Sequence, residues 1–338
     1  MRTVVRLVAV VTAVSLVAAC ARPAGPAPAA SAPAPRPPAS LAEPIGTPPK
    51  LPAGWRWESY GGVQVGVPGD WGWDNRAIRL DAWCIKPGNH PPAVARSGGG
   101  VPAIGCGVGR SGPPAGFLVA NTGWTVAFDR TDKGDGTDRV GDRRTVRRDG
   151  VEVIIQAPKE WQDRIAATIH RVRVDDAGCP TTHRFSTAPD LRPTPPADVT
   201  TLRQVTSVSV CKYPLPQGAY GRPPSPRLLS GLRLDGAAAA DEIRRIAAAP
   251  AGGGPNDPAD CAPEVAHGDQ IIVILVRSAT GSAEITMRYA GCVQNGFDDG
   301  TTVRQLTKAA VAPLVTGPNR VYDGFNGPEK SDMLLPPN

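Results

Sequence analysis

Apolar and polar residues alternate with a period of two in the first half of the chain. The clearest run covers Trp55–Tyr60 and resumes at 63–67, and the Gly61-Gly62 pair between the two stretches is typical of a hairpin turn. These patterns predict an antiparallel β-sheet. Further strands are expected at 78–84, 103–108, 117–120, 125–128 and 151–156.

Residues 159–170 change to a helical period. Trp161, Ile165 and Ile169 recur on one side, whereas the polar residues face elsewhere; these are Lys159, Glu160, Gln162, Asp163 and Arg164. This pattern predicts an amphipathic helix whose apolar side covers the sheet. Residues 53–175 are therefore expected to form one domain, an antiparallel sheet with a closing helix.

Residues 201–316 repeat the order of strands followed by a helix. Almost every residue at 270–277 is apolar, which is typical of a central strand covered on both faces. Thr301 is the expected N-cap of the last helix. The expected elements are, in order, strands at 205–213 and 227–234, a helix at 237–249, strands at 270–277 and 283–290, and a helix at 301–314.

The expected fold class is α+β, with two antiparallel-sheet domains that each pack helices on one face and are stapled by disulfides. The segments outside the two domains are rich in proline and poor in large apolar side chains, so they cannot bury a core of their own. The expected boundaries are a signal peptide at 1–19, a tether at 20–52, the first domain at 53–175, a linker at 176–200, the second domain at 201–316 and a C-terminal tail at 317–338.

The N-terminus has the three parts of a secretory signal peptide. Arg2 and Arg6 come first, an apolar stretch at 7–19 follows, and small residues precede Cys20. The apolar stretch is too short to span a bilayer as a mature helix. These features predict that the protein is exported.

The run Leu16-Val17-Ala18-Ala19-Cys20 resembles the lipobox of bacterial lipoproteins. The resemblance implies that Cys20 is joined to diacylglycerol and anchors the protein to the extracytoplasmic face of the cell membrane. The alternative is an ordinary signal peptide with an incidental cysteine. Residues 21–52 contain eleven prolines, and a polyproline II tether of this length would reach up to roughly 90 Å from the bilayer.

Six cysteines remain when Cys20 is set aside, an even number that is typical of disulfides in an exported chain. The sequence contains no CxxC pair, which argues against a zinc site, and no cysteine is left over for a catalytic thiol. Six cysteines permit fifteen connectivities. Their positions relative to the expected strands favour the pairs Cys84–Cys106, Cys179–Cys211 and Cys261–Cys292.

Basic residues outnumber acidic ones, 37 to 31, and the formal net charge is +6. The chain has no run of basic residues interleaved with aromatic ones, so a nucleic acid is not an expected partner. The positive balance is compatible with a weak attraction to anionic lipid or wall polymer.

Three short patterns suggest chemistry but have a simpler structural explanation. Residues 107–112 match G-x-G-x-x-G, yet two prolines follow where a nucleotide-binding helix would begin. Five aspartates between 129 and 142 lack the spacing of a calcium loop and alternate with basic residues, so a solvated hairpin end is expected. No catalytic motif accompanies the scattered histidines, and no metal or cofactor is expected, although a catalytic triad assembled from distant segments stays open. The histidines are His90, His170, His183 and His267.

All tryptophans fall in the first expected domain. Trp55 and Trp57, like Trp71 and Trp73, are two residues apart, so each pair shares one face of an extended strand. Exposed indoles can stack on sugar rings, whereas buried indoles fill a core, and the scarcity of phenylalanine favours core filling. The seven tryptophans are Trp55, Trp57, Trp71, Trp73, Trp83, Trp124 and Trp161.

The string from Trp57 to Trp73, WESYGGVQVGVPGDWGW, resembles the opening of an uncharacterised exported lipoprotein family of high-GC actinobacteria. Val210-Cys211-Lys212-Tyr213 and the Cys261/Cys292 pair are similar to the same family. The resemblance implies an exported protein but no particular activity. The strand that ends at Val67-Pro68, with Trp71 after it, and the later strand and helix at 151–170 are similar to PsbP-like sandwiches, which implies a sheet-rich fold.

Together these features predict a membrane-anchored protein that binds a cell-wall component or a protein partner and is not an enzyme. The alternative is a cell-wall hydrolase whose catalytic residues come from distant segments. A deep pocket that holds a histidine with a carboxylate would favour the hydrolase, and a flat face lined by tryptophans would favour the binding protein.

Overall fold

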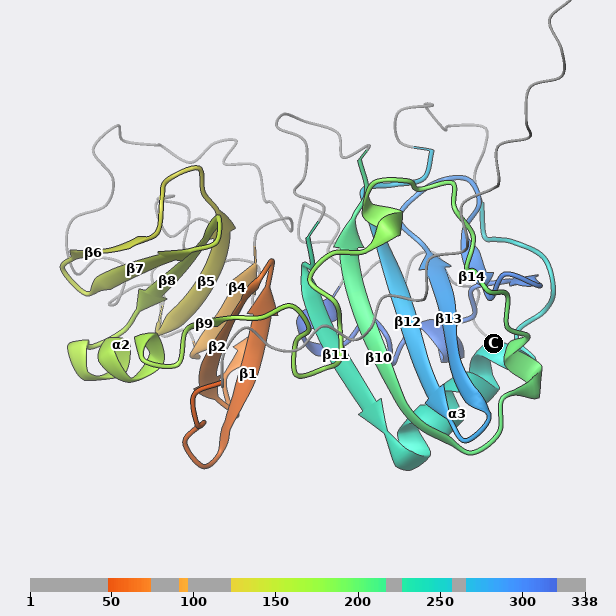
Figure 1. Ribbon diagram of the computed structural model, residues 1–338, viewed down its shortest axis with the longest axis horizontal. Helices are drawn as coiled ribbons and strands as arrows, with labels where there is room; N and C mark the ends of the chain where they lie inside the picture. The colour runs from red at the N-terminus through yellow and green to blue at the C-terminus, as the bar shows by residue number, and fades with distance from the viewer. Residues whose placement is uncertain (1–47, 74–90, 97–122, 217–226, 257–265, 321–338) are drawn as a thin grey trace, which may run out of the picture. The chain divides into compact units, whose positions relative to one another are not determined.

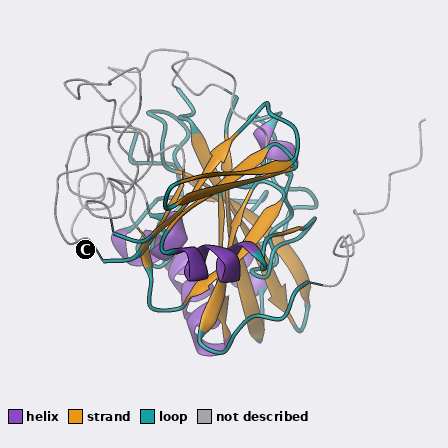
Figure 2. Ribbon diagram, turned by 90° about the vertical axis from the view of Figure 1, so that its left-hand side faces the viewer, coloured by secondary structure: helices purple, strands orange, loops and turns teal. Residues whose placement is uncertain are grey.

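The computed structural model describes residues 48–73, 91–96, 123–216, 227–256 and 266–320. Strands form most of the regular structure and belong to three sheets, and helices are few (Figure 2). The fold is therefore broadly α+β, as expected, but strands dominate it. Within these described ranges, no helix is long and apolar enough to cross a membrane.

A small antiparallel sheet opens the described chain (Figure 1). Its strands, in order across the sheet, are β1 (Trp55–Tyr60), β2 (Val63–Pro68) and β9 (His170–Arg171). The predicted hairpin is confirmed, because Tyr60 pairs with Val63 across Gly61-Gly62. Gly61 has a φ of +59°, and a Cβ atom there would lie 2.8 Å from Val151 Cγ2, so this turn requires glycine.

A second sheet has six strands and is partly parallel. In order across the sheet, they are β3 (Gly72–Trp73), β4 (Ala93–Arg96), β5 (Thr125–Arg130), β8 (Val151–Gln156), β7 (Arg143–Arg148) and β6 (Gly136–Val140). The strands predicted at 125–128 and 151–156 are confirmed as β5 and β8. However, β3, β4 and β5 run parallel, so the prediction of a wholly antiparallel sheet is wrong here.

The parallel pairing has a physical reason in the lengths of the connections. Parallel neighbours need a crossover of a dozen or more residues, and the segments 74–92 and 97–124 supply that length. The strands predicted at 78–84, 103–108 and 117–120 lie outside the described residues. The short strand β4 has only four residues and is not among the predicted elements.

Both sheets and helix α2 (Lys159–Ala166) contribute to one hydrophobic core, which we call the first core. The helix ends four residues earlier than predicted. Thr168 Oγ1 donates to Ile165 O at 2.6 Å and accepts from Gly66 N at 2.8 Å, so the chain leaves the helix to join β2. Buried members of this core include Val63, Val65, Phe128, Ile155 and Ile165.

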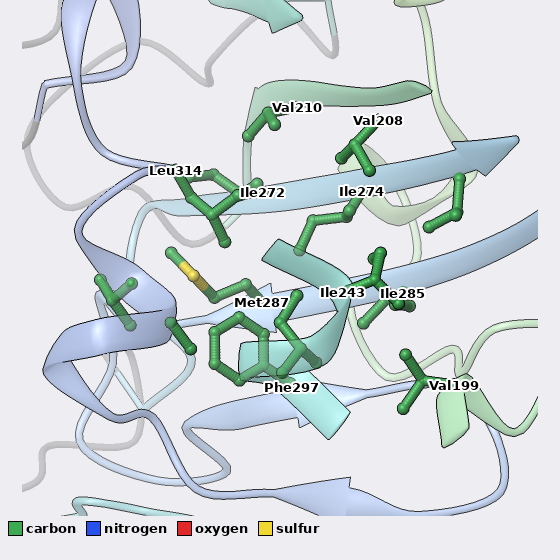
Figure 3. Close-up of a cluster of buried hydrophobic side chains, with 14 of the residues drawn as sticks. Val199, Val208, Val210, Ile243, Ile272, Ile274, Ile285, Met287, Phe297 and Leu314 are labelled. Atoms are coloured by element: carbon green, nitrogen blue, oxygen red, sulfur yellow. The ribbon is translucent and has the colours of Figure 1, made fainter. Parts of the chain in front are cut away.

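The third sheet is antiparallel throughout and also has six strands. In order across the sheet, they are β11 (Ser230–Asp235), β10 (Val205–Pro214), β12 (Gln270–Ser278), β13 (Gly281–Arg288), β14 (Gly296–Asp298) and β15 (Val303–Arg304). The predicted hairpin between β12 and β13 is confirmed, with Ser278 paired to Gly281. Helix α3 (Gly236–Ala248) packs on one face, where Val208, Ile274 and Met287 meet Ile243 and Leu314 (Figure 3).

The predicted last helix at 301–314 is wrong over most of its length. Val303 forms part of β15, and the helix is the single turn α4 (Lys308–Val311). Its N-cap is Thr307, whose side chain accepts from Ala310 N, and not Thr301. Thr301 instead binds the buried Asp299 carboxylate through its backbone N–H and its hydroxyl. This carboxylate organises the 299–302 turn, and the next two residues, Val303 and Arg304, pair with β14 instead of forming a helix.

The opposite face of the third sheet is covered by the expected linker rather than left to solvent. Phe185 in the short helix η1 (Arg184–Ser186) is fully buried there against Tyr213 and Ile271. The Cys179–Cys211 disulfide joins this segment to β10. A second short helix, η2 (Val199–Thr201), follows. The linker is therefore pinned along its length, as its cysteine suggests.

Hydrogen bonds connect the two regions that are expected to be domains. Gly61 N donates to Leu228 O at 2.7 Å, and Arg227 donates to the Asp149 carboxylate at 2.5 Å. The boundaries at 53–175 and 201–316 remain predictions.

Candidate functional site

The side chains of β1 alternate between the first core and a second face, which is half-buried at its tryptophans and buried at Ser59 and Gln64. Tyr60 is buried, and its ring packs on Phe128 with centroids 5.7 Å apart. Trp55 and Trp57 lie an odd number of positions from Tyr60 and so occupy the other face. Both are half-buried. We call this surface the Trp face; its residues are Trp55, Trp57, Ser59, Gln64 and His170.

Trp55 belongs to a group of three indoles at one end of the Trp face. It stacks on Trp161 of α2, with centroids 6.0 Å apart and an interplanar angle of 7°. Trp124, just before β5, is tilted against Trp161 at a centroid distance of 5.2 Å. All three rings are half-buried and pack on the rim of the first core. Core contacts thus hold them in place while part of each ring stays accessible.

Arg164 lies over two of these indoles. Its guanidinium carbon is 5.2 Å from the Trp55 ring centroid and 4.8 Å from that of Trp161. The residue is exposed, and no acidic side chain in the described ranges pairs with it. A cation–π contact contributes about 0.5–1 kcal/mol at an exposed site, so two of them favour one position of the guanidinium group.

Trp57 lies farther along β1 and contacts His170 of β9. The rings meet edge to face, with centroids 4.7 Å apart. The Nδ1 atom of His170 lies 3.0 Å from Thr168 O, and because a carbonyl only accepts, Nδ1 carries the proton. Nε2 is then an acceptor, and it is buried without a partner among the described residues. Trp57 therefore packs against an imidazole whose second nitrogen is unsatisfied.

The polar end of the Trp face is a row across the three strands. Ser59, Gln64 and His170 are neighbours in the strand register. Gln64 Nε2 donates to Ser59 Oγ at 3.0 Å and to Asp176 Oδ1 at 2.7 Å. This amide fixes the turn that carries Asp176 onto the sheet.

Two neighbouring carboxyl groups border this row. Asp175 is 6% exposed and accepts from Cys179 N at 2.7 Å, and its second oxygen has no partner in the part of the chain that the structure describes. Burial raises the pKa of Asp175 to about 7, and the nearby Asp176 carboxylate adds to the effect. Burial of its carboxyl group, together with Glu58, raises the pKa of Asp176 to about 6. Both groups therefore change charge near neutral pH.

The second tryptophan pair does not form a comparable surface. Trp71 is 4% exposed and belongs to the first core. Trp73 Nε1 donates to the buried Glu58 carboxylate at 2.8 Å, and the Arg56 guanidinium lies 4.1 Å from its ring centroid. Trp73 thus has a structural role beside the Glu58 ion pairs with Arg56 and Arg96. Trp83 lies outside the described residues.

Only some of the cysteines lie in the described residues, so the structure tests only some of the predicted disulfides. The Cys179–Cys211 pair is confirmed, with both residues fully buried. Cys292 is disulfide-bonded, but Cys261, its predicted partner, lies outside the described residues. The other predicted cysteine sites, Cys20, Cys84 and Cys106, also lie outside the described residues.

The other two described histidines each pair with a carboxylate. His183 Nε2 lies 3.0 Å from Glu284 Oε2, and its Nδ1 accepts weakly from Phe185 N at 3.5 Å. Both ring nitrogens are thus occupied, so this histidine–carboxylate pair has no nitrogen left to activate a nucleophile. His267 Nε2 lies 3.5 Å from Asp190 Oδ1, and its Nδ1 is buried without a partner among the described residues. His90 lies outside the described residues, as does the 107–112 glycine motif.

Two of the five aspartates between 129 and 142 form ion pairs with arginines that lie outside this stretch. Asp135 binds Arg171, and Asp138 binds Arg147. The predicted charge-balanced hairpin is formed by β6, which is largely exposed, and β7, which is half-buried. In the described ranges, no group of three or more His, Cys, Asp or Glu side chains is placed to hold a metal ion.

Two further ionisable groups are buried away from the Trp face. Burial lowers the pKa of Lys212 to about 7, with a contribution from the Arg96 cation, and its ammonium donates to Arg320 O at 2.9 Å. Burial raises the pKa of Glu242 in α3 to about 7, and Arg245 lies 3.3 Å away. Both have structural partners, so we assign neither to the site.

Asp175 and Asp176 are not identifiable as site residues from the sequence, where they resemble ordinary turn acids after β9. The sequence does contain a signal for Arg164. It follows Trp161 by three positions on a predicted helix, so both residues lie on the same side of that helix. The contact of both residues with Trp55 depends on the tertiary fold.

Comparison of the chain with protein-family models, curated proteins and solved structures finds no match.

Proposed function

We propose that this protein is an exported lipoprotein that binds a carbohydrate polymer of the cell envelope on its Trp face. In this proposal, acylated Cys20 anchors the protein to the extracytoplasmic face of the membrane, and the proline-rich segment at 20–52 carries the folded part toward the wall. The observation that carries the binding function is the pair Trp55 and Trp57, half-buried on one face of β1.

The geometry suits a chain of sugar rings. Two positions along a strand span about 6.6–6.8 Å, so the two indoles present neighbouring apolar surfaces. Trp161 supports Trp55 from behind by stacking, which limits the movement of the ring. Rigid aromatic side chains lose little conformational entropy when they bind a ligand. At the polar end, the exposed Asp176 carboxylate can accept from hydroxyl groups of a ligand, whereas Gln64 is buried and donates to Ser59 and Asp176.

A hydrolase is the second candidate, and the raised pKa values of Asp175 and Asp176 favour it. A carboxyl group that keeps its proton near neutral pH can act as a general acid. The two groups are sequence neighbours, however, and Asp175 is buried against Cys179 and not open to a substrate. We therefore place binding ahead of hydrolysis.

Binding to insoluble cell-wall material tests the proposal. The soluble chain without residues 1–20 should sediment with wall polysaccharide, and Trp57→Ala should reduce the bound fraction at least about fivefold, whereas Trp57→Phe should retain most of it because a ring remains. Trp73→Phe is the matched control, since Trp73 faces Glu58 and not the Trp face.

Two results would count against the proposal. Wall binding that is equal in the wild type and in the Trp55→Ala/Trp57→Ala double variant, with both proteins folded by circular dichroism, would exclude the Trp face. Release of new reducing ends from the polysaccharide, lost in Asp176→Asn, would favour the hydrolase.

A further inference from the structure

Arg164 stands out among the exposed cations of the first sheets because of what surrounds it. Its guanidinium group lies over Trp55 and Trp161, and neither indole can neutralise its charge. Glu160, one helical turn earlier, is the nearest acid on the same side of α2, and it does not pair with Arg164 in the described structure. The five N–H donors of the group are therefore available to a ligand.

The neighbouring acid on the helix is already engaged. Asp163 is shared by three cations: Arg139 at 2.8 Å, Arg144 at 2.7 Å and Lys159 at 3.1 Å. One carboxylate among three cations leaves a local positive excess on this side of α2. The excess favours a negatively charged ligand over a neutral one at the end of the Trp face.

Stacking on the Trp55 and Trp161 rings orients the Arg164 guanidinium group, which favours binding of a planar anion. Arginine binds a carboxylate or a phosphate through two parallel N–H···O bonds, and such charge-assisted bonds are about twice as strong as neutral ones. An arginine that already lies on aromatic rings loses less rotational freedom when it forms them. Trp57, two positions along β1 from Trp55, then offers its ring to the sugar that carries the acid or to its neighbour.

We infer that the ligand of the Trp face is an acidic polysaccharide, whose carboxylate or phosphate group is bound by Arg164 while the sugar rings stack on Trp55 and Trp57. This inference rests on the proposed function and adds the charge of the ligand to it. The shared chemistry is an oxyanion on a sugar chain, and carboxylate and phosphate are its two sources.

Pairs of polymers that differ only in charge test the inference. Polygalacturonate is compared with its full methyl ester, and dextran phosphate with dextran, by tryptophan fluorescence at low and high salt. We expect the wild-type chain to bind at least one acidic polymer about tenfold or more tightly than its neutral match, as one or two charge-assisted hydrogen bonds provide. The first pair reports a carboxylate ligand and the second a phosphate ligand.

Variants of Arg164 test whether this side chain causes the preference for acidic polymers. Arg164→Gln should lower acidic binding to the level of the neutral polymer, and Arg164→Lys should keep part of it, because lysine retains the charge but not the planar fork. Arg244→Gln is the matched control: it also removes one exposed arginine, but from α3. High salt should weaken binding of the acidic polymer more than binding of the neutral one.

The outcomes distinguish a failure of the acid-binding role of Arg164 from a failure of the proposed function. Equal binding of acidic and neutral polymers, or a preference that survives Arg164→Gln, would overturn the acid-binding role while leaving the Trp face in place. Absence of binding to every polymer, or binding that survives the Trp55→Ala/Trp57→Ala variant, would overturn the proposed function as well.

Discussion

Asp175 shows how far folding changes the chemistry of a single residue. Its carboxyl group is almost completely buried, and its pKa rises to about 7. Because the folded state holds this proton more tightly than the unfolded chain does, the proton stabilises the fold at acidic pH. As the pH rises from about 4 to about 7, the unfolded chain ionises first, and the free energy of unfolding falls.

Asp175→Asn should remove this pH dependence. The amide oxygen can still accept from Cys179 N, and the variant has no proton to lose. The wild type should therefore lose stability relative to Asp175→Asn between pH 4 and 7, by up to about 4 kcal/mol for a shift of this size. Urea unfolding at several pH values measures the difference. Glu242 contributes a slope of the same sign to both proteins, so it cancels. Parallel curves would contradict the assignment.

Truncation of different tryptophans in the first region should lower the free energy of unfolding by different amounts. Trp71 is 4% exposed, so Trp71→Ala should destabilise the protein by about 3–5 kcal/mol. Trp57→Ala should cost clearly less, because the ring is only half-buried. Chemical denaturation compares the two. An equal loss in both variants would make Trp57 a core residue and weaken the case for the Trp face.

At the scale of elements, the linker at 176–200 covers a sheet face, as a packed helix usually does. It covers one face of the third sheet with Phe185, while α3 covers the other. The linker has only short helical turns of its own, so its order depends on the contacts that Phe185 and Cys179 make with β10 and its neighbours. The Cys179–Cys211 disulfide holds it at one end.

Replacement of both Cys179 and Cys211 by alanine should loosen this cover. The bridged residues are 32 positions apart, and a loop of that length corresponds to about 3–4 kcal/mol in a chain-entropy model. Thermal unfolding should shift downward, and residues 176–200 should exchange amide hydrogens faster than the third sheet. Uniform exchange protection in the variant would show that packing of Phe185 alone holds the linker.

Elements with a strong local pattern are predictable from the sequence, and those that depend on distant partners are not. The β1–β2 hairpin and the β12–β13 hairpin follow from alternation and glycine, and both are found where the sequence predicts them. The parallel pairing of β4 with β5 joins segments far apart in the chain, and β4 is too short to show a period. In the 301–314 segment, apolar spacing predicts a helix, but Val303 and Arg304 pair with β14, a partner that local spacing does not reveal.

The candidate site is predictable to a similar degree. The spacing of Trp55 and Trp57 correctly places both on one strand face, and it does not reveal that Trp71 and Trp73 differ in burial. Arg164 acquires its role only because α2 packs beside β1. A single sequence cannot show that juxtaposition.

At the scale of the whole molecule, the proposal depends on the anchor at Cys20. Cys20→Ala should remove the acylation site, so the protein should leave the membrane fraction or remain as an uncleaved precursor. Fractionation followed by mass spectrometry of the N-terminus measures both outcomes. The wild-type protein fractionated in parallel is the control. A correctly cleaved Cys20→Ala protein that stays fully in the membrane fraction would contradict the lipid anchor.

The turn at Gly61 has a practical consequence for protein engineering. Hairpin ends usually accept inserted tags, but this one donates its backbone N–H to Leu228 O and leaves no room for a Cβ atom beside Val151. Extra residues there would separate β1 from the segment leading to β11. The β6–β7 turn at Gly141 and Asp142 is exposed instead. A fluorescent label or affinity tag should therefore be tolerated at that turn.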